Sequence, residues 1–202
     1  MANIVKKEKS MITNKIKNLV AVTSIAAAAL LSPSAFGEDG GAFFGKKAAG
    51  KWVIGAKAVN IDPNAPNVDD SRGVGIVVGY EFDTTVGYGS GKSSFEIEYI
   101  QGDKQEFTLT NPTTYEANVL NAFFSYRSPG TVYYKLKGGL SYVDIDVVTS
   151  TALFDDFEET SFALGGGLGV RIGDYGVVEL EYTQDTGDSD LGLLSLNGLL
   201  NF

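Results

Sequence analysis

The sequence contains no histidine and no cysteine, and its two methionines, Met1 and Met11, both lie near the amino terminus. Without histidine, neither a Ser–His nor an Asp–His catalytic pair can be built, which removes the commonest general base. Without cysteine, there is no disulfide framework and no thiolate metal site. The sequence therefore predicts a protein that is not an enzyme and has no cofactor.

Basic residues are scarce outside the first 37 positions. Residues 38–202 contain 11 Lys and Arg against 24 Asp and Glu, a formal net charge of −13. Because binding of nucleic acid begins with a basic patch, we exclude nucleic acid as a partner.

Long apolar runs are also absent, with one exception at the amino terminus. Five lysines up to Lys17 precede the apolar stretch Leu19 to Leu31, and the small residues of 35–37 (AFG) follow it. This order is typical of a secretory signal. The apolar stretch is shorter than the roughly 20 residues that a membrane-spanning helix needs. We predict a signal over residues 1–37, a short segment over 38–49 and a single domain over 50–202, with Met1 or Met11 as the start.

Stretches that alternate apolar and polar residues recur about every twenty residues from Gly50 onward, separated by clusters of Gly, Pro, Asn, Asp or Ser. There are eight, at residues 52–58, 74–82, 95–99, 120–127, 132–142, 162–172, 178–183 and 191–202. Successive side chains of a strand point to opposite faces, so each stretch offers an apolar and a polar face. Only helices and closed barrels satisfy all backbone groups in a membrane. The pattern predicts a barrel.

The connections between these stretches differ in length. Residues 128–130 and 173–176 form short connections, whereas 60–72, 101–114 and 144–160 form long ones. Membrane barrels have short periplasmic turns and long extracellular loops, so we place both termini and segment 38–49 in the periplasm. The connection 83–92 is long for a periplasmic turn.

The polar faces together carry five acids and five bases. They are Glu81, Glu96, Glu98, Glu179, Glu181, Lys57, Lys135, Lys137, Arg127 and Arg171. An eight-stranded barrel is only wide enough for its own side chains, and buried charges are tolerated when they are paired. We therefore expect a closed, salt-bridged interior with a structural role. The alternative is a narrow path for ions that needs this network to open.

Two glycine-rich stretches resemble nucleotide-binding motifs without matching them. Residues 87–93 (GYGSGKS) end like a P-loop, but Val86 stands where the first glycine belongs, and a strand rather than a helix follows. Residues 165–169 (GGGLG) lack GxGxxG spacing and lie inside a predicted strand. Neither stretch predicts nucleotide binding.

Acidic residues concentrate in the predicted loops. They include Asp69, Asp70, Asp155, Asp156, Glu158, Glu159, Asp185, Asp188 and Asp190. None of these runs has the spacing of an EF-hand loop, so we interpret them as solvated loops, with divalent cations or surface ligands as the alternative. Residues 152–157 (ALFDDF) add apolar side chains, which mark either a contact surface or a loop folded over the barrel mouth.

The last stretch, 191–202 (LGLLSLNGLLNF), places Leu194, Leu196, Gly198, Leu200 and Phe202 on one face. It resembles the closing strand of Gram-negative outer-membrane β-barrels, in which the terminal Phe, here Phe202, is the assembly signal. With its signal and eight stretches, the whole chain resembles the small eight-stranded outer-membrane barrel family typified by the OmpA membrane domain and OmpX.

This resemblance implies an all-β, eight-stranded, antiparallel up-and-down transmembrane β-barrel in the cell outer membrane. Its implied partners are outer-membrane lipid and lipopolysaccharide, together with the barrel assembly machinery and periplasmic chaperones during biogenesis. The implied function is a structural or surface-interaction role, because related barrels that are enzymes use a histidine. Two alternatives stay open: a small porin-like channel for ions or small solutes, and a soluble lipocalin-like binder with its apolar face inward.

Overall fold

The computed structural model describes residues 50–63, 70–86, 89–106, 113–149 and 157–202. The predicted signal (1–37), the predicted segment 38–49 and the loop residues 152–156 lie outside the described residues. Among the described residues, no helix has the length and hydropathy that crossing a membrane requires.

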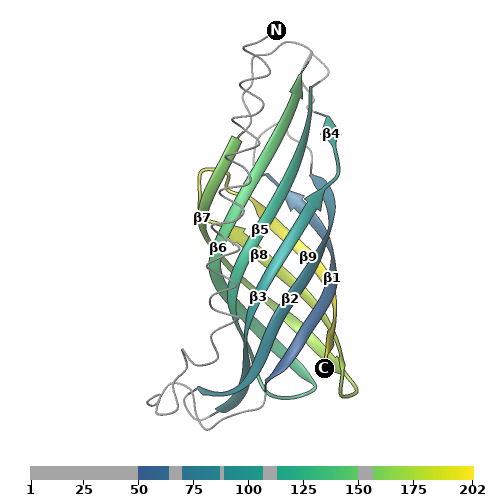
Figure 1. The fold of residues 1–202 in the computed structure, drawn as a ribbon, viewed down its shortest axis with the longest axis vertical. Coiled ribbons are helices and arrows are strands. Elements are labelled where there is room, and N and C mark those ends of the chain that lie inside the picture. The colour runs from purple at the N-terminus through teal and green to yellow at the C-terminus, as the bar shows by residue number, and fades with distance from the viewer. Residues whose placement is uncertain (1–49, 64–69, 87–88, 107–112, 150–156) are drawn as a thin grey trace. The chain divides into compact units, whose positions relative to one another are not determined.

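The described residues form a single antiparallel sheet that closes on itself (Figure 1). Its strands are β1 (Lys51–Asp62), β2 (Ser71–Val86), β3 (Gly89–Gly102), β4 (Gln105–Glu106), β5 (Thr113–Arg127), β6 (Val132–Thr149), β7 (Phe157–Ile172), β8 (Gly176–Asp185) and β9 (Gly192–Asn201). Apart from the short β4, strands that follow one another in sequence are neighbours in the sheet, and the pairing of β3 with β5 makes the ring continuous. The two-residue β4 also pairs with β5, beyond the end of β3. The fold is therefore an eight-stranded up-and-down β-barrel, which confirms the predicted fold class.

The first and last long strands close the barrel. β1 pairs with β9 from Val53 opposite Asn201 to Asp62 opposite Gly192. Trp52 and Phe202 continue this ladder: the Trp52 N–H donates to the Phe202 carbonyl at 2.9 Å, and the Phe202 N–H donates to the Trp52 carbonyl at 3.0 Å. The carboxy-terminal residue thus takes part in the hydrogen bonds that seal the sheet.

The prediction of a long connection over residues 83–92 is wrong. Pairing between β2 and β3 continues to Val86 opposite Gly89, so only residues 87 and 88 separate the two strands. Runs of Gly, Ser, Thr and Asp favour loops locally, but here residues 82–86 of β2 pair in register with residues 89–93 of β3, and this ladder overrides the local preference. The same pairing places Gly89 to Ser93 of the GYGSGKS stretch in a strand. The connections β2–β3, β5–β6 and β7–β8 lie at this end of the barrel, and all three are short. We call it the short-turn end, and the opposite end the long-loop end.

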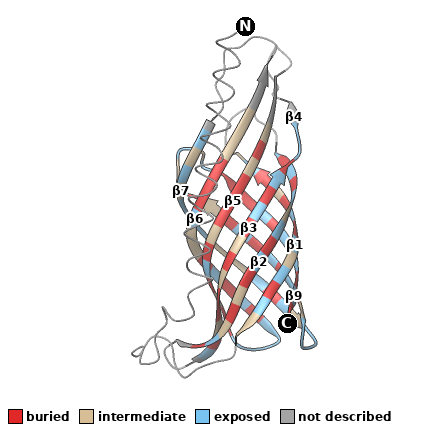
Figure 2. Ribbon diagram, viewed as in Figure 1, coloured by how far each residue is buried: buried red, intermediate tan, exposed pale blue. Residues whose placement is uncertain are grey.

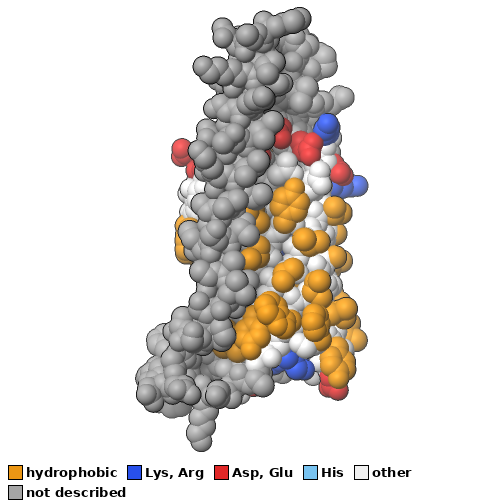
Figure 3. All heavy atoms as spheres, viewed as in Figure 1, with side chains coloured by type: hydrophobic (Ala, Val, Ile, Leu, Met, Phe, Trp, Pro, Cys, Tyr) orange, Lys and Arg blue, Asp and Glu red, His pale blue; other side chains and the backbone are white. Residues whose placement is uncertain are grey.

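Buried and exposed residues alternate along the strands (Figure 2). Large apolar side chains are prominent among the exposed residues, and the charged side chains in the middle of the barrel are buried. Leu168 and Leu196 are 64% and 55% exposed, whereas Glu96 is 1% exposed. Figure 3 shows hydrophobic side chains over the middle of the barrel surface and charged side chains at its two ends. The apolar face points outward, which is the reverse of what a soluble lipocalin-like binder requires.

Candidate functional site in the barrel lumen

Nine of the ten predicted interior residues are buried in the lumen, each at most 4% exposed. They are Lys57, Glu81, Glu96, Glu98, Arg127, Lys135, Lys137, Glu179 and Glu181. All nine lie on inward-facing positions of the strands, and they come from six of them: β1, β2, β3, β5, β6 and β8. The period-two pattern therefore brings residues from all around the ring to one site.

Arg127 stands at the short-turn side of this site and binds acids from three strands. Its Nε lies 2.7 Å from Glu179 Oε1, and its Nη2 lies 2.7 Å from Glu96 Oε1. Its Nη1 donates to Ser94 Oγ at 2.7 Å and lies 3.6 Å from Glu81 Oε2. The planar guanidinium has five N–H donors, and this arrangement gives them acceptors on several sides.

Lys135 lies at the centre of the network. Its Nζ is 2.9 Å from Glu96, 3.0 Å from Glu179 and 2.5 Å from Glu181. An ammonium has three donors, so each N–H can meet one carboxylate. Because Glu96 and Glu179 also bind Arg127, the two cations share both acids.

Lys137 and Lys57 continue the network. Lys137 Nζ lies 2.9 Å from both Glu98 and Glu181, and 4.5 Å from the centre of the Phe123 ring. Lys57 Nζ lies 2.7 Å from Glu98 and 3.6 Å from Glu181. Each of the five acids of this network thus faces at least one base, which is the condition under which charges are tolerated out of water.

Inward-facing glycines of β7 make room for these long side chains. A Cβ added at Gly165 would lie 3.0 Å from Lys137 Cε, and one added at Gly169 would lie 2.3 Å from the Tyr133 ring. The Tyr133 hydroxyl in turn donates to Glu179 at 2.5 Å. The GGGLG stretch therefore serves close packing inside the barrel.

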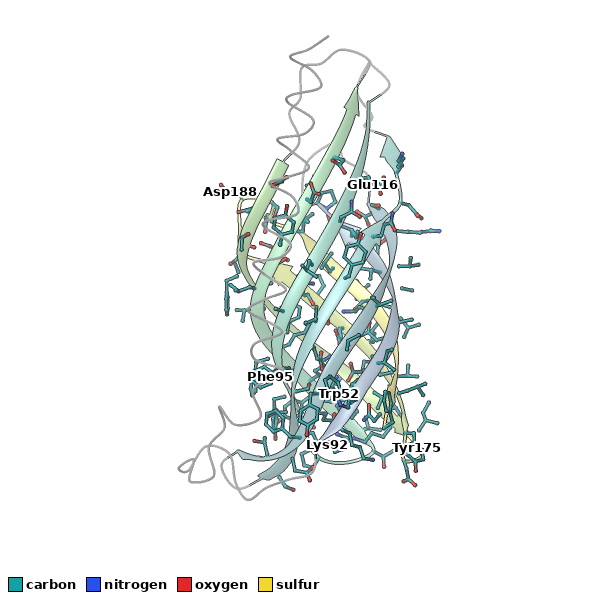
Figure 4. All side chains as sticks on the ribbon, in the orientation of Figure 1. Trp52, Lys92, Phe95, Glu116, Tyr175 and Asp188 are labelled. Atoms are coloured by element: carbon teal, nitrogen blue, oxygen red, sulfur yellow. The ribbon has the colours of Figure 1, made fainter. Side chains whose placement is uncertain are left out.

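The prediction for Arg171 needs correction. Its guanidinium donates to the backbone carbonyls of Ser128 and Gly130 and lies 4.2 Å from the centre of the Tyr133 ring. It sits at the end of β7, where solvent and turn carbonyls replace the acids of the lumen. The fifth base is Lys92, whose Nζ lies 2.8 Å from Glu81. Sequence reasoning missed Lys92 because the strand around it was read as a turn; Figure 4 shows it at the short-turn end.

Two apolar clusters inside the barrel were also missed. The long-loop layer consists of Val59, Ile61, Ile100, Val119, Val143, Leu191 and Leu193. The short-turn layer consists of Val53, Val77, Tyr133, Val177 and Leu199. The sequence does contain a signal for these clusters, because Val53, Val59 and Ile61 lie on the same inward face of β1 as Lys57. The prediction missed it because it assigned the inward face from charged residues alone.

Acids at the long-loop end hold a loop in place. Glu159 accepts hydrogen bonds from the N–H groups of Asp188 at 2.6 Å and Ser189 at 2.8 Å. Asp185 accepts from Ser161 Oγ at 2.5 Å and from the Gly187 N–H at 2.7 Å. No group of three or more acids in the described part of the chain is arranged to hold a metal ion.

These contacts make the β8–β9 loop sensitive to acid. Desolvation raises the pKa of Glu159, but the hydrogen bonds from Asp188 and Ser189 together lower it by more, so the pKa lies below the ordinary glutamate value of about 4.3. A lowered pKa contributes stability above the ordinary value that is lost as pH falls through the folded pKa. We expect the amide signals of Asp188 and Ser189 to shift on acidification below the ordinary glutamate pKa, and Glu159→Gln to abolish that titration. An unchanged titration in Glu159→Gln would contradict this role.

Comparison with known proteins shows a likeness in fold and no closer relationship. No protein-family model matches the sequence, and no curated protein sequence matches it. Among solved structures, the chain is similar to Ail, the attachment invasion locus protein of Yersinia pestis, with a TM-score of 0.51, 15% identity and coverage of 77% of this chain and 99% of Ail. Neisserial surface protein A is also similar, with a TM-score of 0.49, 15% identity and coverage of 78% and 100%. For the N-terminal barrel of Pseudomonas aeruginosa OprF, the TM-score is 0.44, with 14% identity and coverage of 76% and 100%. The chain has the fold of the small eight-stranded outer-membrane β-barrels to which Ail belongs.

Proposed function

We propose that this protein is a non-enzymatic integral outer-membrane barrel that acts as a closed scaffold and presents its acidic loops at the cell surface. The observation that carries the proposal is the separation of side chains by the barrel wall. Apolar residues cover the outside, and the charged residues of the lumen are paired with one another.

The outer surface fits lipid. Along β8 and β9, Leu180, Leu196 and Leu200 are each more than half exposed, which in water would be unfavourable for so large a continuous apolar surface. In a bilayer the same surface is matched to its solvent, and each long strand of the described barrel pairs with a neighbour on both sides, as hydrocarbon requires. Aromatic rings in mutual contact near the short-turn end, such as Trp52 with Tyr80 and Phe95 with Phe124, suit the membrane interface.

The lumen fits a closed scaffold. The cations of the network each contact carboxylates at hydrogen-bonding distance, so an ion entering the lumen has to displace an existing partner. An eight-stranded barrel leaves little space beyond its own side chains. A channel for ions or small solutes requires these contacts to break.

The long-loop end supplies the surface. Asp70, Asp103, Asp188 and Asp190 are exposed there, and Arg72 and Lys104 are the basic residues of the described part of that end. This acidic surface suits divalent cations bound to lipopolysaccharide, or basic patches on host and neighbouring surfaces. In the same proposal, residues 1–37 direct export and are then removed. Segment 38–49 and both termini of the mature chain lie in the periplasm. Periplasmic chaperones and the barrel assembly machinery recognise Phe202.

Planar-bilayer recording of refolded residues 38–202 tests the closed scaffold. We expect no steady single-channel openings, because the lumen is filled by paired charges. Detergent or lipid is expected to be required to keep the protein in solution. Steady openings whose conductance changes in Lys135→Met would instead establish the channel, and a monomer that is stable in plain buffer would remove the membrane location.

A further inference from the structure

The β2–β3 hairpin extends beyond both of its neighbours at the short-turn end. The ladder between β1 and β2 ends at Glu81, and the ladder between β3 and β5 ends at Lys92. The pairing of β2 with β3 nevertheless continues to Val86 opposite Gly89. The last residues of the hairpin therefore form a two-stranded ribbon that projects past the strands on either side of it.

The two sides of this ribbon differ. On the β3 side, a Cβ added at Gly91 would lie 2.5 Å from the Tyr126 ring and 2.7 Å from the Arg127 carbonyl oxygen, so the end of β5 covers that side. On the β2 side, no strand among the described residues pairs with residues 83–86. The open edge of the ribbon is that of β2.

The hydrogen bonds at the start of β1 show in which direction the backbone groups of β2 point. Trp52 exchanges both of its backbone hydrogen bonds with Phe202, on the β9 side of β1. In an antiparallel ladder, successive residues of a strand bond to opposite sides. Lys51 therefore faces β2, and Glu81, which lies opposite Lys51, faces β1.

The same alternation defines the open edge. The backbone N–H and C=O groups of Asp83 and Thr85 point toward it, as those of Glu81 point toward β1. The backbone groups of Thr84 and Val86 point toward β3 instead. A row of backbone groups of this kind is a template on which a further strand can add.

The chain that leads into β1 lies beside this edge. A Cβ added at Gly50 would lie 2.3 Å from the Tyr80 ring, so the chain still runs along β2 one residue before β1 begins. In the register of β1 with β2, residues 46–49 fall opposite residues 83–86. Because this segment is attached through Gly50, its effective concentration at the edge is far higher than that of a separate protein.

The composition of residues 46–49 (KKAA) suits an outer strand. Lysine is a residue type with which proteins protect the edge of a sheet from pairing with another chain. In the register given above, Lys47 shares a face with the exposed Asp83 and stands diagonally across from it, a position that allows opposite charges to attract.

We propose that residues 46–49 extend β1 along the open edge of β2, with Ala49 opposite Asp83, and give the ribbon an outer edge that carries lysines. The partner of this surface is the amino-terminal segment of the same chain. The edge is then closed to strands of other proteins. This inference goes beyond the closed scaffold and does not depend on whether the lumen conducts.

Amide hydrogen exchange of refolded residues 38–202 in lipid tests the pairing. Thr84 and Val86 bond to β3 and serve as internal references for a protected amide. We expect Asp83 and Thr85 to be protected as well, because the added strand supplies their acceptors. Rapid exchange at Asp83 and Thr85, with protection kept at the two references, would overturn the proposal.

Two proline variants identify the strand that provides this protection. Ala49→Pro removes an N–H that faces β2 and is expected to abolish the protection of Asp83 and Thr85. Ala48→Pro is the matched control, because its missing N–H faces solvent, where an edge strand tolerates proline. Protection that survives in Ala49→Pro would show that another strand, such as one from a second copy, occupies the edge, and would overturn the proposal.

Disulfide formation gives a second measurement, and the chain has no cysteine that interferes. Ala48 and Thr84 fall opposite each other in a non-hydrogen-bonded pair, in which Cα atoms lie about 4.5 Å apart, within reach of a disulfide. We expect Ala48→Cys, Thr84→Cys to form an intramolecular disulfide. The control Ala48→Cys, Ser90→Cys, with its second thiol on the far strand of the ribbon, is expected to stay reduced. Equal bonding in both, or bonding only between molecules, would contradict the pairing. Migration of unheated samples on denaturing gels verifies that each variant is folded.

Discussion

Lys135→Met is expected to lower the free energy of unfolding by about 3–5 kcal/mol, the range seen when one partner of a buried ion pair is removed. Methionine keeps much of the length of the side chain but removes the charge that lies within 3.0 Å of Glu96, Glu179 and Glu181. At 2% exposure, the site gives these carboxylates little access to bulk water. Equilibrium unfolding in lipid vesicles, followed by the fluorescence of the single tryptophan, Trp52, measures the change.

Lys104→Met is the matched control, because it removes the same charge from a surface pair. The Lys104 side chain is 68% exposed, and its Nζ lies 3.9 Å from Glu116. Exposed pairs of this kind contribute about 0–1 kcal/mol, so the control is expected to change stability by no more than that. Equal effects of the two substitutions would mean that the lumen is hydrated and that the network adds little.

A charge-balanced double variant identifies the cause of the loss. Glu81, Glu96, Glu98, Glu179 and Glu181 face Lys57, Lys92, Arg127, Lys135 and Lys137, so Lys135→Met leaves one acid in excess. Removing a second charge with Glu181→Gln restores the balance. We expect the double variant to be more stable than the sum of the two single effects predicts, by about 0.5–3 kcal/mol. Simple additivity would show that lost packing, and not uncompensated charge, causes the destabilisation.

The features that could be predicted from the sequence are those with a local, period-two signal. Lys135 and Lys137 alternate with Tyr134 and Leu136, and that spacing alone places the lysines on one face and the apolar residues on the other. Because charges are costly in lipid and can be paired in a narrow lumen, the charged face is assigned to the inside and the apolar face to the outside. The assignment of nine lumen residues needed nothing from distant parts of the chain.

Partner choice and register could not be predicted in the same way. Arg127 binds Glu179, 52 residues later, and Asn201 donates to Glu81, 120 residues earlier. Such contacts depend on which strands face each other across the bore and on how far each strand is shifted along its neighbour. The role of Lys92 follows from the β2–β3 register, which brings it to Glu81, eleven residues earlier in the chain, within a hairpin that was read as a loop. The long-loop layer draws on β1, β3, β5, β6 and β9, and no short window of sequence contains that relationship.

Leu180→Arg is expected to lower the free energy of unfolding in a bilayer by about 2–4 kcal/mol, because an arginine at the middle of the lipid-facing surface is costly there. Leu180 lies midway along β8, 53% exposed, between the outward-facing Leu168 and Leu196 on the neighbouring strands. In a soluble protein, an exposed leucine replaced by arginine usually changes stability by less than about 0.5 kcal/mol. The substitution therefore distinguishes a membrane barrel from a soluble one.

Ile172→Arg is the depth control for this substitution. Ile172 is 61% exposed and faces outward as Leu180 does, but it is the last residue of β7, beside the turn. The cost of an outward arginine falls to about 0–1 kcal/mol near the interface, where its guanidinium reaches water and headgroups. Guanidinium unfolding of both variants in the same vesicles gives the difference. A difference of about 1–4 kcal/mol between the two sites places the bilayer midplane near Leu180, whereas equal and negligible effects would show that no hydrocarbon surrounds this surface.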